Sequence, residues 1–105
     1  MNAAPEYKLE AFRAHLEAET KRGYIAQGYD PERHRHDCRV KIGRKYANVD
    51  RGDSGVYMVD LATGEIFGIK AYGVIHRGHQ YGTLDTIHEW DWSDYRASRK
   101  QQAAA

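Results

Sequence analysis

Three residues of types that bind metal ions, His34, His36 and Cys38, alternate along one short segment of the chain. On a β-strand, residues two apart point to the same side, so all three would project from one face. Imidazole and thiolate are preferred ligands of Zn²⁺, and His76 or His79 could supply a fourth. However, same-face neighbours on a strand lie ~7 Å apart, and three rarely converge on one ion. We therefore expect these histidines to cover part of a sheet, with a zinc site as the alternative.

Basic residues occupy the alternate positions of the same segment. Between residues 33 and 45, one acid, Asp37, stands against six cations: Arg33, Arg35, Arg39, Lys41, Arg44 and Lys45. A stripe of cations on the exposed face of a strand suits a phosphate backbone, and Tyr46 could stack on a base. The alternative is an ordinary solvated face, or a sheet edge that charge protects from aggregation. The net charge of the whole chain is only +1, which argues against strong general affinity for DNA.

A third candidate site combines acids with aromatic rings in the segment 88–95. Its candidate partner-binding residues are Trp90, Asp91, Trp92, Asp94 and Tyr95. Aromatic anchors within a charged rim are typical of protein-binding hot spots. Because aliphatic residues are scarce, we expect at least one of the two tryptophans to lie in the core instead. The acids could also pair with the basic segment of a second copy, which would give a homodimer.

No arrangement typical of an enzyme is found in the sequence. Ser54 lies in a glycine-containing turn but lacks the context of a nucleophile elbow. The sequence contains no phosphate-binding glycine loop and no helical histidine pair with a glutamate between. Cys38 and His36 would not have the geometry of a nucleophile pair on a strand. We therefore predict a protein that is not an enzyme and that needs no cofactor.

One helix is predicted over residues 5–22. Leu9, Phe12 and Leu16 fall on one stripe of such a helix, and Gly23 suits the position after its last turn. The stripe is narrow, and an isolated helix of this length is marginal in water. The helix must therefore pack on another element.

The segment 33–87 is predicted to form the sheet. From residue 33, cations alternate with histidine, cysteine and aliphatic residues, which is typical of a strand with one exposed face. A hairpin is predicted from strands 56–60 and 65–72, with Gly64 in the left-handed position of its loop. Gly68 indicates a bulge or a close backbone approach.

Together these elements predict an α+β fold, with an N-terminal helix packed on a small, curved, antiparallel sheet of three to five strands. Closure into a small barrel is an alternative. One domain spans residues 1–105, with a flexible tail over 96–105. Eight tyrosines and two tryptophans add the apolar area that aliphatic residues do not supply.

The chain is expected to lie in the cytoplasm. No apolar run approaches the ~18 residues of a membrane helix, so no membrane partner is predicted. The first residues do not resemble a secretory signal, and the single cysteine suits a reducing compartment.

Two stretches occur together in the middle of the chain: G-R-K-Y at 43–46 and V-D-L-A-T-G-E-I-F at 59–67. This pattern resembles a broad set of small, uncharacterised proteins encoded by tailed phages and prophages. The resemblance covers roughly the middle half of the chain and implies no activity. It implies a phage origin, expression in the host cytoplasm, and a non-catalytic role in binding a host or defence-system macromolecule.

The leading functional hypothesis is therefore a small phage accessory protein that binds a host or defence-system macromolecule, with Trp90, Trp92 and Tyr95 as candidate anchors and the basic residues of 33–45 as a second surface. One alternative is nucleic-acid binding through the basic residues of 33–45. The other is a zinc-binding protein that uses His34, His36 and Cys38.

Overall fold

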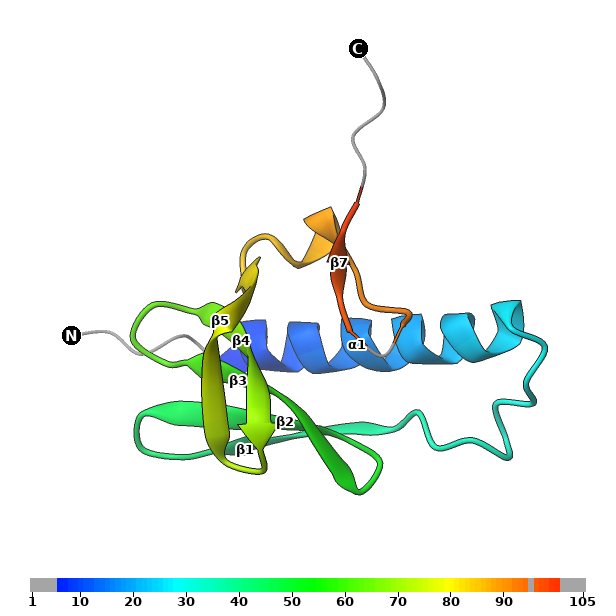
Figure 1. Cartoon of the computed structure of the whole chain (residues 1–105), viewed down its shortest axis with the longest axis horizontal. Helices are drawn as coiled ribbons and strands as arrows, with labels where there is room; N and C mark the ends of the chain where they lie inside the picture. The colour runs from blue at the N-terminus through cyan, green and yellow to red at the C-terminus, as the bar shows by residue number, and fades with distance from the viewer. Residues whose placement is uncertain (1–5, 95, 101–105) are drawn as a thin grey trace, which may run out of the picture.

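The computed structural model describes residues 6–94 and 96–100. One helix, α1 (Glu6–Ala26), packs on a five-stranded antiparallel sheet (Figure 1). The strands follow one another in sequence order: β1 (Cys38–Ile42), β2 (Tyr46–Arg51), β3 (Ser54–Asp60), β4 (Glu65–Ala71) and β5 (Val74–Thr83). A 3-10 helix, η1 (Ile87–Glu89), leads into a two-stranded sheet of β6 (Trp90–Asp91) and β7 (Ser98–Arg99).

The predicted α+β fold is confirmed, and its main sheet has five strands, the upper end of the predicted range of three to five. The sheet does not close into a barrel, because β1 and β5 stand at opposite ends of the strand order. Among the described residues, no helix is both long enough and apolar enough to span a bilayer. Within 96–105, where the sequence predicts a flexible tail, Ser98 and Arg99 pair with Asp91 and Trp90 as β7, and residues 101–105 lie outside the described residues.

Helix α1 buries the predicted apolar stripe of Leu9, Phe12 and Leu16. It does not end at residue 22, however, and Gly23 lies inside it and is buried. A Cβ on Gly23 would lie 2.1 Å from the carbonyl oxygen of Ser93. This glycine therefore permits a close approach rather than ending the helix. The left-handed turn that follows the helix is made by Gly28, whose φ is +84°.

The strand predicted to begin at Arg33 begins instead at Cys38. Asp30 organises the preceding residues into a turn, because its side chain accepts a hydrogen bond from the Glu32 amide at 2.9 Å and its carbonyl accepts one from the Arg33 amide at 3.0 Å. Such local bonds compete with a sheet ladder. The predicted alternation of exposed cations with covered residues holds only from Cys38, which is buried, to Lys41, which is exposed.

The hairpin of β3 and β4 is confirmed, with Gly64 at φ +78° in its loop. The ladder between β4 and β5 is less regular. Gly68 is opposite His76, whereas Phe67 is opposite Gln80, so residues 77–79 of β5 bulge out of the ladder. This bulge is opposite Gly68, where the sequence predicted a bulge or a close approach.

Aromatic rings fill the centre of the core, between α1, the sheet and the C-terminal segment. Trp92 is fully buried, and its ring centroid lies 4.8 Å from that of Phe12 and 5.2 Å from that of Tyr57. Its indole Nε1 donates a hydrogen bond to the carbonyl of Ile87 at 2.8 Å. The hydroxyl of Tyr57 accepts one from the Ala97 amide at 3.1 Å. The C-terminal segment is therefore an integral part of the fold.

Candidate functional site

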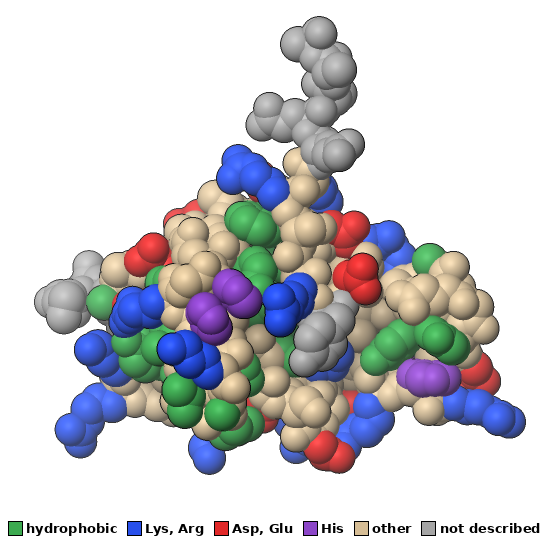
Figure 2. All heavy atoms as spheres, in the orientation of Figure 1, with side chains coloured by type: hydrophobic (Ala, Val, Ile, Leu, Met, Phe, Trp, Pro, Cys, Tyr) green, Lys and Arg blue, Asp and Glu red, His purple; other side chains and the backbone are tan. Residues whose placement is uncertain are grey.

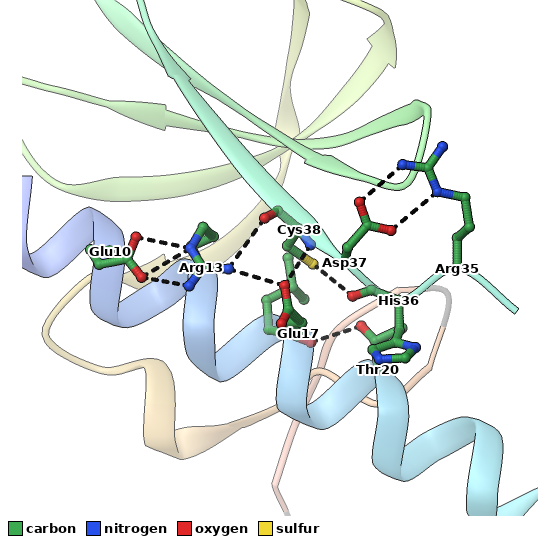
Figure 3. A network of polar contacts seen from close by, with 9 residues as sticks. Glu10, Arg13, Glu17, Thr20, Arg35, His36, Asp37 and Cys38 are labelled. Carbon is green, nitrogen blue, oxygen red and sulfur yellow. Dashed lines mark hydrogen bonds and ion pairs between the residues drawn. The ribbon is translucent and has the colours of Figure 1, made fainter. Parts of the chain in front are cut away.

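The six basic residues of 33–45 fall into two groups that differ in their neighbours. Arg33 and Arg35 lie in the loop before β1, close to acids. The guanidinium of Arg35 binds Asp37 at 3.0 Å and Asp53 at 2.6 Å, and the Arg35–Asp37 contact is seen in Figure 3. Arg33 lies 3.9 Å from Asp30. The charges of these two arginines are therefore largely balanced by neighbouring carboxylates.

The other four residues, Arg39, Lys41, Arg44 and Lys45, lie on β1 and in the turn to β2, and all four are exposed. Within residues 6–94 and 96–100, none of them has a carboxylate within 4.0 Å. Asp50 is opposite Arg39 in the ladder, but its carboxylate accepts a hydrogen bond from the hydroxyl of Tyr72 at 3.2 Å. These four cations are therefore open to an external anion.

An aromatic ring and a fifth cation adjoin this group. Ala47 and Val49 of β2 are buried toward α1, so Tyr46 points to the opposite face of the sheet, as Arg39 and Lys41 do. The guanidinium of Arg77, from β5, lies 5.7 Å from the centre of the Tyr46 ring and donates a hydrogen bond to its hydroxyl.

We call this surface the basic face; its residues are Arg39, Lys41, Arg44, Lys45, Tyr46 and Arg77. Figure 2 shows Lys and Arg side chains around a hydrophobic patch at the end of the sheet where the β1–β2 turn lies. Arg77 was absent from the sequence prediction, because no spacing in the sequence reveals that β5 bulges. The guanidinium also lies 5.3 Å from the centre of the Phe67 ring, which holds it against the sheet.

The proposed zinc ligands are not brought together. The ring of His34 lies in the loop, 4.9 Å from that of Tyr29 and 5.4 Å from that of Tyr24. Cys38 is buried beneath α1, and its thiol points to the carbonyl of His36 at 3.5 Å. His76 and His79 stack on each other in β5. In the part of the chain that the structure describes, no three His, Cys, Asp or Glu residues are arranged to hold a metal ion.

Cys38 is instead fixed to the helix. Its amide donates to Glu17 Oε1 at 2.9 Å, and its carbonyl accepts from Arg13 Nη1 at 3.3 Å (Figure 3). Arg13 also binds Glu10 at 2.6 Å. Burial raises the pKa of the Cys38 thiol to about 11, so it is protonated at neutral pH. These contacts give Cys38 a structural role at the start of the sheet.

The predicted partner-binding segment is divided between core and surface. Trp92 cannot be an anchor for a partner, because it is fully buried. Trp90 is partly exposed. The centre of its ring lies 5.8 Å from that of Tyr81 and 6.0 Å from the guanidinium of Arg99.

The acids of this segment also differ. Asp91 accepts hydrogen bonds from the amide of Ser93 at 2.9 Å and from its hydroxyl at 2.5 Å, and these bonds lower the pKa of its carboxyl. Asp91 also lies 3.3 Å from Arg22, so it joins the segment to α1. Asp94 is exposed, and Tyr95 lies outside the described residues.

No family model matches the chain, and no curated protein or solved structure is significantly similar to it. The resemblance to phage proteins therefore stays a prediction.

Proposed function

We propose that this protein binds single-stranded nucleic acid, without catalysis, through the basic face. The observation that carries the proposal is the set of four exposed cations that have no carboxylate within 4.0 Å among the described residues, next to the ring of Tyr46. Phosphates attract such cations, and the release of counterions from the nucleic acid drives binding. The small net charge of the chain does not oppose this, because many of its acids are paired with other cations, as Glu10 is with Arg13 and Asp85 with Lys8.

Tyr46 favours a single strand over a duplex. Proteins that bind single strands combine a cationic groove with aromatic rings on which bases stack. The hydrogen bond from Arg77 holds the ring at a fixed place within the basic face. Lys45 and Arg77 also lie over the ring, 5.7 Å from its centre, so a base that stacks there takes the place of one of these two side chains. Stacking of one base on such a ring is worth about 1–3 kcal/mol.

Binding of a host protein through the segment 88–95 has weaker support. Trp92 lies in the core, and the carboxylate of Asp91, although its side chain is 42% exposed, is already bound to Ser93 and Arg22. A nucleic acid is also a host macromolecule, so the proposal keeps the non-catalytic class of function that the phage resemblance implies. The proposed location is accordingly the cytoplasm of a bacterial host.

The test is the binding of a fluorescent single-stranded oligonucleotide of about 15 nucleotides, followed by anisotropy over a range of salt concentrations. If all four cations contact phosphates, the logarithm of the affinity should fall with the logarithm of salt at a slope of about −3. The variant Arg39→Gln/Lys41→Gln should bind more weakly and lower the slope by about 1.4.

A matched control variant is Arg33→Gln/Arg99→Gln. These arginines are also exposed, but each lies near a carboxylate, Asp30 and Glu89 respectively. The control should bind as the wild type does. Failure of the wild type to bind at low salt, or equal losses in the two double variants, would contradict the proposal.

The role of Tyr46 is tested separately with Tyr46→Leu, which keeps an apolar side chain at this position. Loss of stacking on one base should weaken binding about tenfold, because about 1.4 kcal/mol corresponds to a factor of ten. The salt slope should stay unchanged, since no cation is removed. If Tyr46→Leu binds as the wild type does, the ring does not take part, and the basic face would bind phosphate alone.

A further inference from the structure

The bulge of β5 at residues 77–79 directs side chains to both sides of the sheet. Phe67 and Gly68 are neighbours in β4 and therefore face opposite sides. Arg77 lies over Phe67, on the basic face, whereas His79 lies over Gly68, on the other side. Bulges commonly re-aim side chains next to functional sites. The histidine side of the bulge is therefore a second candidate binding site.

Two glycines allow this side of the bulge to form. A Cβ on Gly68 would lie 3.2 Å from Cβ of His79 and 3.4 Å from the ring of Tyr81. A Cβ on Gly78 would lie 3.0 Å from the ring of His76. With no Cβ in either place, the two imidazoles stack in parallel, with centroids 4.0 Å apart and planes at 9°.

The stacked histidines form one wall of a cleft of about 220 Å³. Its other polar side chains are Tyr57, Tyr81 and Arg96, and Gly68 also lines it. Figure 2 shows histidine side chains together with Arg or Lys over β4 and β5. Among the described residues that line the cleft, none is Asp or Glu.

Among the described residues, the nitrogen-bearing groups of the cleft have no acidic partner. Arg96 has no carboxylate within 4.0 Å among the described residues. Nδ1 of His76 is buried without a hydrogen-bond partner in the same part of the chain. Three groups that can each carry a positive charge thus line one concave place, and an anion there would offset their charge.

We propose that this cleft binds a phosphate group, with His76, His79 and Arg96 as its ligands. The volume is below the ~300 Å³ at which pockets for drug-sized molecules begin, so it suits a compact tetrahedral oxyanion. Arg96 supplies a permanent charge and several N–H donors, and each imidazole supplies one donor when neutral and two when protonated. The phosphate group could be inorganic phosphate or the end of a phosphomonoester.

Binding should take up a proton. The charge of His76 is the main cause that lowers the pKa of His79, followed by burial and by the charge of Arg96. Tyr57 also faces the cleft, and burial raises its pKa to about 12, so its hydroxyl stays neutral. A divalent anion between these groups offsets their repulsion and stabilises the protonated imidazole. Affinity should therefore rise as the pH falls.

The inference is independent of nucleic-acid binding, because Arg77 and the basic face lie on the opposite side of the sheet. The experiment is a titration with sulfate at constant ionic strength, followed through the imidazole C–H resonances of the six histidines by NMR. Sulfate stays divalent across the pH range, whereas a phosphoryl group titrates near pH 6 and would confuse the result. We expect saturable binding at pH 6, and affinity about tenfold weaker at pH 8, as for the loss of about 1.4 kcal/mol.

Variants identify the ligands. His79→Gln and Arg96→Gln should each weaken sulfate binding about tenfold, the loss of one charge-assisted hydrogen bond. Arg33→Gln and His34→Gln remove an exposed arginine and histidine outside the cleft and should leave the affinity unchanged. The proposal is wrong if sulfate moves the resonances of His76 and His79 no more than those of His34, or if the control variants lose as much affinity as the cleft variants.

A second arm separates the two sources of phosphate. Inorganic phosphate and adenosine 5′-monophosphate are titrated at pH 7 into the wild type and into Arg96→Gln. If the cleft serves phosphomonoesters, the nucleotide should bind at least as tightly as phosphate, and both should weaken in the variant. If only inorganic phosphate binds, the cleft holds the free ion. Binding of neither would overturn the proposal.

Discussion

The backbone of Gly23 in α1 lies directly against the carbonyl of Ser93, so that a Cβ at position 23 would be 2.1 Å from the carbonyl oxygen. Ser93 in turn binds Asp91, and Asp91 lies 3.3 Å from Arg22 on the preceding position of the helix. These contacts join the last turns of α1 to the segment that carries Trp92 into the core.

Gly23→Ala should destabilise the protein by about 2 kcal/mol, because the added methyl group overlaps the Ser93 carbonyl. Helix propensity alone predicts the opposite, a gain of about 1 kcal/mol. Urea denaturation measures the difference. Ala18→Gly, at an exposed position of the same helix, is the control and should lose about 1 kcal/mol through propensity. A Gly23→Ala protein more stable than the wild type would show that the helix and Ser93 are not in contact.

The two tryptophans should differ in their effect on stability. Trp92→Ala removes a fully buried ring and should cost about 3–5 kcal/mol, which is much of the stability of a small domain. Trp90→Ala should cost less, since this ring is partly exposed. Acrylamide quenching of the single-tryptophan proteins Trp90→Phe and Trp92→Phe gives an independent measurement. The fluorescence of Trp90 should be quenched more readily than that of Trp92, and equal quenching would contradict the burial of Trp92.

Cys38 should not react with thiol reagents while the protein is folded. Burial raises the pKa of its thiol to about 11, and only the thiolate reacts. A disulfide reagent at pH 8 should therefore modify Cys38 slowly in buffer and rapidly in denaturing urea, where the pKa returns to ~8.5. The rate in buffer should follow the unfolding rate as urea is added. Fast reaction in the absence of urea would show that β1 does not hold Cys38 under α1.

His15 should make stability depend on pH in the range where carboxylates do not titrate. Burial is the main cause that lowers its pKa; Glu19 opposes this, whereas His88, Lys100 and Arg22 add to it. The unfolded chain, with a pKa of ~6.5, then binds more protons than the folded protein. Neutral His15 therefore makes its full contribution to the free energy of unfolding above pH ~6.5. This contribution is lost as the pH falls toward the lower pKa that His15 has in the folded protein.

The measurement is the urea midpoint at pH 7.5 and at pH 5.5. The wild type should be less stable at the lower pH, and His15→Gln should reduce this difference, while His34→Gln, an exposed histidine, should not. Nε2 of His15 is buried without a partner among the described residues, so a proton added there has no acceptor. An unchanged pH dependence in His15→Gln would assign the effect to another group.

The sequence predicts the parts of this fold that local patterns determine. The stripe of Leu9, Phe12 and Leu16 identifies α1, and the alternation around a Thr-Gly loop identifies the β3–β4 hairpin. The prediction of a strand from Arg33 is wrong. A two-residue period does not reveal the hydrogen bonds that Asp30 accepts from the residues that follow it. Gly23 does not end the helix as the sequence predicts: a glycine near a helix end is typical of a cap, but this one contacts Ser93, far along the chain.

The candidate sites depend on contacts that no spacing reveals. Six basic residues looked alike in the sequence, yet Arg35 lies between two acids and Lys41 has no carboxylate within 4.0 Å among the described residues. Arg77 and His79 take part only because β5 bulges between them. Tertiary context, rather than residue type, thus separates the candidate ligands from the structural residues.

The contact between the rings of Phe12 and Trp92 joins positions at the two ends of the described chain. Because most of the stability of a helix in a protein comes from tertiary packing, α1 reaches its full stability only when Trp92 packs against Phe12. Contacts so distant in sequence also close slowly, which leaves the newly made protein open to chaperones and proteases for longer than a helical bundle of equal size.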